Sequence, residues 1–255
     1  MPWLTAIGFL AVLVVNALSA GLPLNGQTPA QISDHIPNLF VPAGLTFSIW
    51  GVIYLALAVY VVHVFRTRAA DRRTARLFLL SCAANVAWIF LWHYGLVFPS
   101  LVAMLFLLGS LIAIDRGQER IRRETPDRAV FWMAIVPFRI YLGWISVATL
   151  ANVVAVLVTA GWDGFGLADQ SWTILLVAVA CLLALARLLL QRDIAFAAVV
   201  LWAFAGILLR HFTTFEGVYP VLLGAVSLLS LVLLSGITTT TVGVLRGGRG
   251  GKAAS

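Results

Sequence analysis

The sequence has little charge, few cysteines and almost no lysine. Charged residues make up 11% of the 255 residues and hydrophobic residues 62%, with a mean hydropathy of +1.01. A soluble domain of this length is nearer half apolar. Because the apolar residues also stand in long blocks, the composition predicts a polytopic α-helical membrane protein and argues against a soluble globular domain.

These scarcities also argue against several kinds of chemistry. Cys82 and Cys181 lie in apolar segments without a CxxC neighbour, which is typical of small buried side chains and not of a disulfide or metal site. Lys252 stands near the C-terminal end, so no apolar block carries the lysine that a retinal Schiff base needs. The sequence has no HExxH, no P-loop and no paired intramembrane acids. We therefore predict no catalytic residues and no metal site.

Apolar blocks long enough to cross a bilayer occur eight times. A spanning helix needs about 20 residues, and the blocks predict an all-α bundle of about eight transmembrane helices. We expect a tight hairpin at "FPS", around Pro99, between the third and fourth helices. The first block ends in a pattern that a signal peptidase could cut, but no Lys or Arg precedes it, and we expect it to stay as a helix. The predicted helices are 3–20, 44–65, 77–97, 99–115, 130–158, 171–190, 194–211 and 218–240.

The arginines predict the orientation of these helices. They cluster after the second and fourth helices, between the sixth and seventh, and in the tail, whereas 21–43, 98–99 and 159–170 contain no Lys or Arg. With eight helices, all the basic segments fall on one side, which the positive-inside rule makes the cytoplasm. We therefore predict a multi-pass protein of the cell (inner) membrane with both termini cytoplasmic. The net charge of +7 is then a topology signal, and no nucleic-acid partner is expected.

Three stretches resemble one family. "VPAGLTFSIWGVIY" (41–54), "NVAWIFLW" (85–92) and "WISVATLAN" (144–152) resemble patterns in the second, third and fifth helices of the TspO/MBR family, the tryptophan-rich sensory or translocator proteins. The resemblance implies a five-helix membrane bundle over residues 1–160. A further three-helix membrane segment is expected at 161–242, followed by a disordered basic tail at 243–255.

Helical spacing sorts the matching positions onto one face of each helix. Such faces either pack helix against helix through small and polar residues, or line a pocket that suits a flat, mostly apolar ligand. Relatives bind tetrapyrroles and, in some cases, sterol-like lipids, so the resemblance implies a pocket beneath 21–43, which would form a lid. Porphyrin or haem is a possible ligand, and membrane lipids and a second copy of the chain are possible partners. The candidate ligand-binding residues are Trp50, Tyr54, Asn85, Trp88, Trp92, Trp144, Ala148 and Asn152.

Arg139 stands inside the apolar stretch 134–158. At 100° per residue it shares a face with Gly143 and points away from the tryptophan face of the same helix. A guanidinium that faces lipid costs several kcal/mol. We therefore predict that Arg139 is a structural charge that faces the last three helices and pairs with Asp193, with Asn85 as the rival partner. A substrate-gating or anion-binding role is the alternative.

Three functions remain open from the sequence. The leading hypothesis is a membrane binding protein, sensor or carrier for a hydrophobic planar small molecule. The second is a small-molecule transporter with Arg139 on its path. The third is a membrane enzyme that acts on a lipid or pigment and uses His35, His93 and His211, which lie on one side of the predicted topology.

Overall fold

The computed structural model describes residues 1–22, 24–67, 71–124 and 127–250. Every regular element within these ranges is a helix, which confirms the all-α prediction. Eight helices in the described ranges are long and apolar enough to cross a membrane, as the sequence predicted. Most of these helices begin and end within a few residues of the ends of the predicted apolar blocks.

The spanning helices are joined by short helical elements. The 3₁₀ turn η2 (Gly44–Ser48) leads into α3, and α6 (Arg128–Val130) and the π-helical turn η3 (Phe131–Ile135) lead into α7. Between α1 and η2 lie η1 (Leu24–Gly26) and α2 (Pro29–Asp34), and η4 (Gly164–Gly166) precedes α8. The long helices are α1 (Pro2–Gly21), α3 (Ile49–Thr67), α4 (Arg72–His93), α5 (Val97–Glu124), α7 (Val136–Thr159), α8 (Asp169–Gln191), α9 (Ile194–Thr213) and α10 (Pro220–Gly250).

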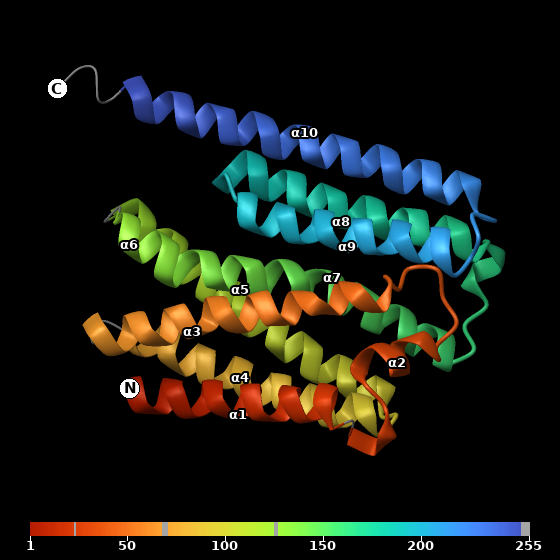
Figure 1. The fold of residues 1–255 in the computed structure, drawn as a ribbon, viewed down its shortest axis with the longest axis horizontal. Helices are drawn as coiled ribbons and strands as arrows, with labels where there is room; N and C mark the ends of the chain where they lie inside the picture. Colours follow the sequence, from red (N-terminus) through yellow and green to blue (C-terminus); the bar gives the residue numbers. More distant parts are fainter. Residues whose placement is uncertain (23, 68–70, 125–126, 251–255) are drawn as a thin grey trace.

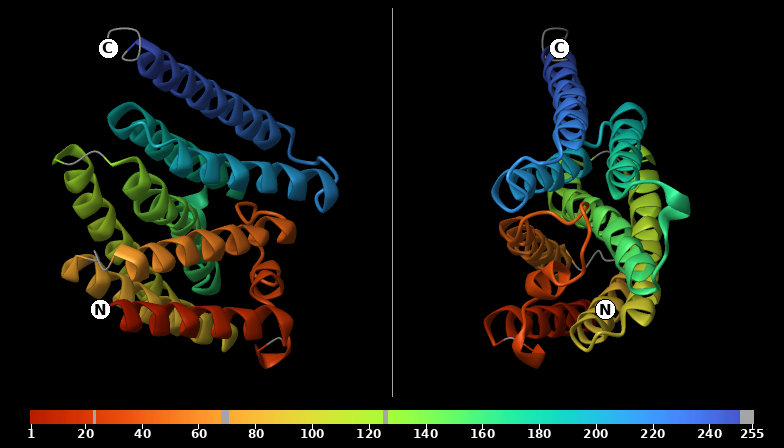
Figure 2. Two further views of the ribbon diagram at one scale, coloured as in Figure 1. Left: turned by 60° about the vertical axis from the view of Figure 1, so that its left-hand side comes forward. Right: turned by 90° about the vertical axis from the view of Figure 1, so that its right-hand side faces the viewer.

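The long helices run roughly parallel or antiparallel to one another (Figure 1). One group consists of α1, α3, α4, α5 and α7, and the other consists of α8, α9 and α10, with α10 on the outside (Figures 1 and 2). Helix α9 joins the groups because it packs along α7. The N-terminus and the C-terminal end of α10 lie at one end of the bundle and α2 lies at the other (Figure 1).

A glycine allows α7 and α9 to approach closely. A Cβ atom on Gly143 would lie 3.1 Å from the carbonyl oxygen of Phe196 and 3.1 Å from the Cβ of Val199. Small residues at such crossings are typical of membrane helices, where close backbone contact supplies much of the packing energy. Gly143 therefore marks the seam between the five-helix group and the C-terminal three helices.

The predicted hairpin at "FPS" is wrong. Helix α4 ends at His93, the turn follows immediately, and Pro99 lies in the first turn of α5. Gly95 has a φ of +70° and supplies the left-handed conformation that commonly ends a helix. Proline is tolerated in the first helical turn, where its missing N–H has no intrahelical partner anyway. The third spanning helix, predicted at 77–97, therefore ends four residues earlier than predicted.

Two helices run further than the sequence predicted. Helix α5 continues from the predicted end at residue 115 to Glu124, because Asp115, Gln118 and Glu119 share one helical face and all three are buried against neighbouring helices. Helix α10 continues to Gly250, past the predicted start of the tail at 243. The last part of that predicted tail, 251–255, lies outside the described residues.

Candidate functional site

A small cavity lies between α3, α4 and α7, beneath a lid that we define as residues 24–43. Helix α2 of the lid starts with a capping box, in which Thr28 accepts a hydrogen bond from the Gln31 amide and Gln31 accepts one from the Thr28 amide. The lid contributes five residues to the cavity and the helices contribute the others. The lining residues are Ser33, Ile36, Asn38, Val41, Pro42, Phe47, Trp50, Trp88, Trp92, Trp144, Val147, Ala148, Ala151, Asn152 and Ala155.

Four tryptophans form the aromatic wall of this cavity. The Trp50 and Trp88 rings are stacked, with centroids 6.3 Å apart, and the Trp88 and Trp92 rings are stacked at 5.9 Å. The Trp144 ring meets Trp50 edge to face at 6.3 Å. Edge-to-face and stacked pairs at these distances are favourable arrangements for aromatic rings, so the wall is continuous across α3, α4 and α7.

Six of the eight candidate ligand-binding residues line the cavity, and Tyr54 and Asn85 do not. Tyr54 stacks on Trp50 at 5.6 Å and faces a second groove, between α1 and α3, which shares Phe47 and Trp50 with the cavity. Asn85 is fully buried, donates a hydrogen bond to the Tyr141 hydroxyl (3.0 Å) and accepts one from the Asn16 amide (2.8 Å). Its side chain therefore ties together α1, α4 and α7.

The polar groups of the cavity wall are mostly bonded to one another. Trp88 Nε1 donates to Asn152 Oδ1 at 3.0 Å, and Asn152 Nδ2 donates to Ser100 Oγ at 3.1 Å. Trp92 Nε1 donates to the carbonyl of Pro29 in the lid at 3.3 Å. Trp144 Nε1 is buried and has no hydrogen-bond partner among the described residues.

The cavity is small. Its volume is about 50 Å³, whereas pockets for drug-sized ligands begin at roughly 300 Å³. It has room for a few water molecules. A larger ligand therefore requires the lid or a wall of the cavity to move.

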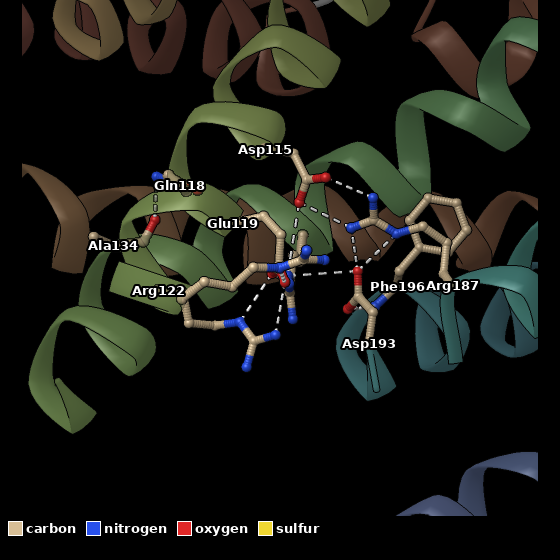
Figure 3. Close-up of polar contacts among 10 residues, drawn as sticks. Asp115, Gln118, Glu119, Arg122, Ala134, Arg187, Asp193 and Phe196 are labelled. Atoms are coloured by element: carbon tan, nitrogen blue, oxygen red, sulfur yellow. Dashed lines mark hydrogen bonds and ion pairs between the residues drawn. The ribbon is translucent and has the colours of Figure 1, made fainter. Parts of the chain in front are cut away.

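Arg139 lies in a buried charge cluster with Asp115, Glu119 and Asp193, and these three acids are labelled in Figure 3. The residue is 1% exposed. Its Nη2 lies 2.8 Å from Glu119 Oε2, and its Nε lies 3.6 Å from Asp193 Oδ2 and 3.7 Å from Asp115 Oδ1. Asp193 is the partner that the sequence proposed, but Glu119 makes the shortest contact, and the rival Asn85 is bonded elsewhere.

A second arginine completes the charge cluster. Arg187 on α8 holds Asp115 through two hydrogen bonds of 2.6 and 2.9 Å, and its Nε and Nη2 also donate to Asp193, the Nε bond being 2.9 Å. Asp193 also caps α9 by accepting a bond from the Phe196 amide at 3.0 Å (Figure 3). The cluster therefore joins α5, α7, α8 and α9.

Two further arginines reach the cluster from its outer side. Arg122 and Arg123 bond to Glu119 at 2.7 and 3.0 Å, and Arg123 is largely exposed. Arg139 precedes Trp144, the first cavity residue on α7, by five positions, and none of the charged residues of the cluster lines the cavity. The charge cluster is therefore separate from the cavity.

The three histidines of the enzyme hypothesis each have a hydrogen-bond partner elsewhere in the chain. His93 Nδ1 lies 2.7 Å from the Ile89 carbonyl, and His211 Nε2 lies 3.0 Å from the Leu39 carbonyl. His35 Nδ1 lies 3.3 Å from Gln27 Nε2. In the described part of the chain, no group of three His, Cys, Asp or Glu side chains is placed to hold a metal ion. These contacts give the enzyme hypothesis no support.

The fold and the cavity define a class: a multi-pass membrane protein whose aromatic cavity is lined in part by a lid between its first two spanning helices. The sequence model described as TSPO-like protein matches residues 2–239, and the chain belongs to this family, as the three stretches indicated. The match includes α8, α9 and most of α10 as well as the first five spanning helices. Neither the curated proteins nor the solved structures gave a match.

Proposed function

We propose that the protein is a membrane-embedded binding protein that acts as a sensor or carrier for a hydrophobic planar small molecule. A tetrapyrrole such as a porphyrin is the ligand class that the family resemblance favours. The observation that carries the proposal is the wall of four tryptophans at the cavity beneath the lid. Flat aromatic faces bind flat apolar rings through dispersion and stacking.

The polarity of the cavity supports a ligand with few hydrogen-bonding groups. Asn152, the only amide that the helices contribute to the wall, is already bonded to Trp88 and Ser100. Trp144 Nε1 is a donor without a partner among the described residues. A buried donor left unpaired costs about 1–3 kcal/mol, so a ligand with a hydrogen-bond acceptor beside Trp144 would gain affinity.

The charge cluster favours a binding protein over a transporter. A substrate path through the bundle needs polar groups that are free to contact the substrate. Arg139, the residue on which the transporter hypothesis relied, is surrounded by three carboxylates and does not line the cavity. We therefore assign Arg139 a structural role.

The proposed location is the cell (inner) membrane, with both termini in the cytoplasm. The support is that the arginine-rich ends of the helices, the N-terminus and the C-terminal end of α10 lie at one end of the bundle (Figure 1). Arg210 lies at the other end, where it is paired with Asp34 of the lid. Lipids that surround the apolar helices, and a second copy of the chain, remain the proposed partners.

A fluorescence titration tests the binding proposal. Protoporphyrin IX added to the purified protein in detergent should quench tryptophan emission saturably, and Trp50→Ala or Trp144→Ala should weaken binding at least about tenfold, because each ring covers one side of the cavity. Trp132→Ala is the control, because Trp132 is exposed and does not line the cavity. Unsaturable quenching, or an affinity that neither cavity variant changes, would reject the proposal.

A further inference from the structure

A ligand reaches the cavity only if something that covers it moves. The volume of about 50 Å³ is far too small for a ring system, and five of the lining residues belong to the lid. The forces that hold the lid in place therefore limit access to the cavity. These forces come from two helices at opposite ends of the lid.

The N-terminal end of the lid is attached to α4 by neutral hydrogen bonds. Asn25 Nδ2 donates to the carbonyl of His93 at 3.0 Å, and Trp92 Nε1 donates to the carbonyl of Pro29 at 3.3 Å. The chain enters the lid from α1 on this side. This end is therefore suited to act as the fixed side of a moving lid.

The C-terminal half of the lid, together with η2, is attached to α9. Arg210 pairs with Asp34, and His211 Nε2 lies 3.0 Å from the Leu39 carbonyl. The Ala43 amide donates to the carbonyl of Gly206 at 2.9 Å. Just after the lid, Trp202 Nε1 donates to the carbonyl of Thr46 at 3.0 Å.

Three of these contacts come from one stripe of α9. Trp202, Gly206 and Arg210 follow at intervals of four residues and therefore share a face of the helix. Gly206 lets the chain lie directly on that face, because a Cβ atom there would overlap the side chains of Thr46 and Pro42. A helix without glycine at this position would push the end of the lid away.

The ion pair is the part of this attachment that is easiest to break. In the described ranges it is the one ion pair that joins the lid to another element. The Arg210 side chain is 11% exposed and the Asp34 side chain is 45% exposed, so water reaches the acid. Partly exposed ion pairs contribute less to stability than buried ones. When this pair opens, water can solvate the carboxylate of Asp34.

We propose that α9 is the clasp of the lid: its stripe of Trp202, Gly206 and Arg210, together with His211, holds residues 34–46 over the cavity, so α9 controls ligand access. The ligand in this proposal rests on the proposed function, whereas the attachment of the lid does not. These four residues of α9 are positioning residues, because they act on the lid and do not line the cavity.

Hydrogen–deuterium exchange tests the clasp without any ligand. Arg210→Gln and Gly206→Ala should each speed exchange in peptides that cover residues 34–46, including the Ala43 amide, by about two- to fivefold or more. Peptides from α5 and the charge cluster should be unchanged. The controls are Arg120→Gln, which removes an exposed pair with Glu124 at the other end, and Gly224→Ala, where a Cβ atom would meet open space.

A charge swap separates the clasp from a general loss of stability. Asp34→Arg and Arg210→Asp should each loosen the lid, and the double variant should restore slow exchange at residues 34–46. Loosening in the single variants without recovery in the double variant would mean that the pair does not hold the lid. Unchanged exchange in Arg210→Gln and Gly206→Ala would overturn the proposal.

Binding kinetics test the consequence for access. With protoporphyrin IX as the probe, Arg210→Gln should raise both the association and the dissociation rate by about two- to fivefold. Unchanged rates beside faster lid exchange would show that ligand enters elsewhere, for example through the groove between α1 and α3, and would overturn the control of access by α9. If the wild-type protein does not bind the probe, the proposed function fails with this ligand, while the exchange experiment still decides the clasp.

Discussion

Arg139 on α7 and Glu119 on α5 form an ion pair of 2.8 Å inside the helical bundle. Arg139 is 1% exposed, and Asp115 and Asp193 lie within 3.7 Å of its Nε. A buried charge without a partner is far more costly than a buried pair. The pair therefore stabilises the fold chiefly by leaving neither charge alone, and it fastens α5 to the seam between the two groups of helices.

The two residues should show strong thermodynamic coupling. Glu119→Gln alone should lower the free energy of unfolding by about 1–3 kcal/mol, because Arg139 loses its nearest carboxylate. Arg139→Met alone should also destabilise the protein, because three acids then face one another beside Arg187. The double variant should recover part of the loss, as measured by thermal unfolding in detergent. Additive single effects would contradict the pair, and Glu124→Gln, in an exposed pair, is the control.

Asp193 has two roles that substitutions can separate. It pairs with two arginines and caps α9. Asp193→Asn keeps a capping side chain and removes the charge, whereas Asp193→Ala removes both, so the alanine variant should be less stable by about 1 kcal/mol more. Asp71 caps α4 without an ion pair among the described residues, so Asp71→Asn should be nearly neutral. Equal effects of asparagine at both positions would show that the charge of Asp193 contributes nothing.

Gly143 should tolerate no larger side chain. Gly143→Ala would place a methyl group 3.1 Å from the Phe196 carbonyl oxygen, so α7 and α9 must separate. We expect a loss of about 1–3 kcal/mol in the free energy of unfolding. Gly109→Ala in α5 is the matched control, because a Cβ atom there meets nothing within 4 Å, and it should be neutral or slightly stabilising. Equal stability of the two variants would contradict the close seam.

The proposed orientation has a direct test. Reporter fusions after residues 120 and 246 should both report cytoplasm, because the helix ends at these positions lie on the arginine-rich side. A fusion after residue 165, in η4, should report the opposite side. A reporter at 246 that faces away from the cytoplasm would contradict the arrangement of eight spanning helices with both termini on one side.

Much of the fold was predictable because the apolar blocks match spanning helices in length and spacing. The wall of the cavity was predictable for a similar reason, since Trp88 and Trp92 are four residues apart on α4 and must share a face. The turn at Gly95 was missed because Pro99 was read as a turn residue, although proline also suits the first turn of a helix.

The polar contacts between distant segments were not predictable. Glu119 was assigned to a loop, because hydropathy ended the fourth helix at its first charged residue. Its burial depends on arginines that come from other helices. Arg210 ends an apolar block, and its partner Asp34 is 176 positions away, so no local pattern connects the two. Polar residues at spacings of three and four, such as Asp115, Gln118 and Glu119, are the signal that could have revealed the extended helix.

A structure of the protein with protoporphyrin IX tests the central claim most directly. We expect the macrocycle to lie between Trp50, Trp88 and Trp144, with an acceptor atom within hydrogen-bond distance of Trp144 Nε1. We also expect the lid to be displaced from its contacts with α9, because the cavity holds only about 50 Å³. A macrocycle bound in the groove between α1 and α3, or on the outer faces of α8–α10, with the tryptophan wall unchanged, would contradict the account.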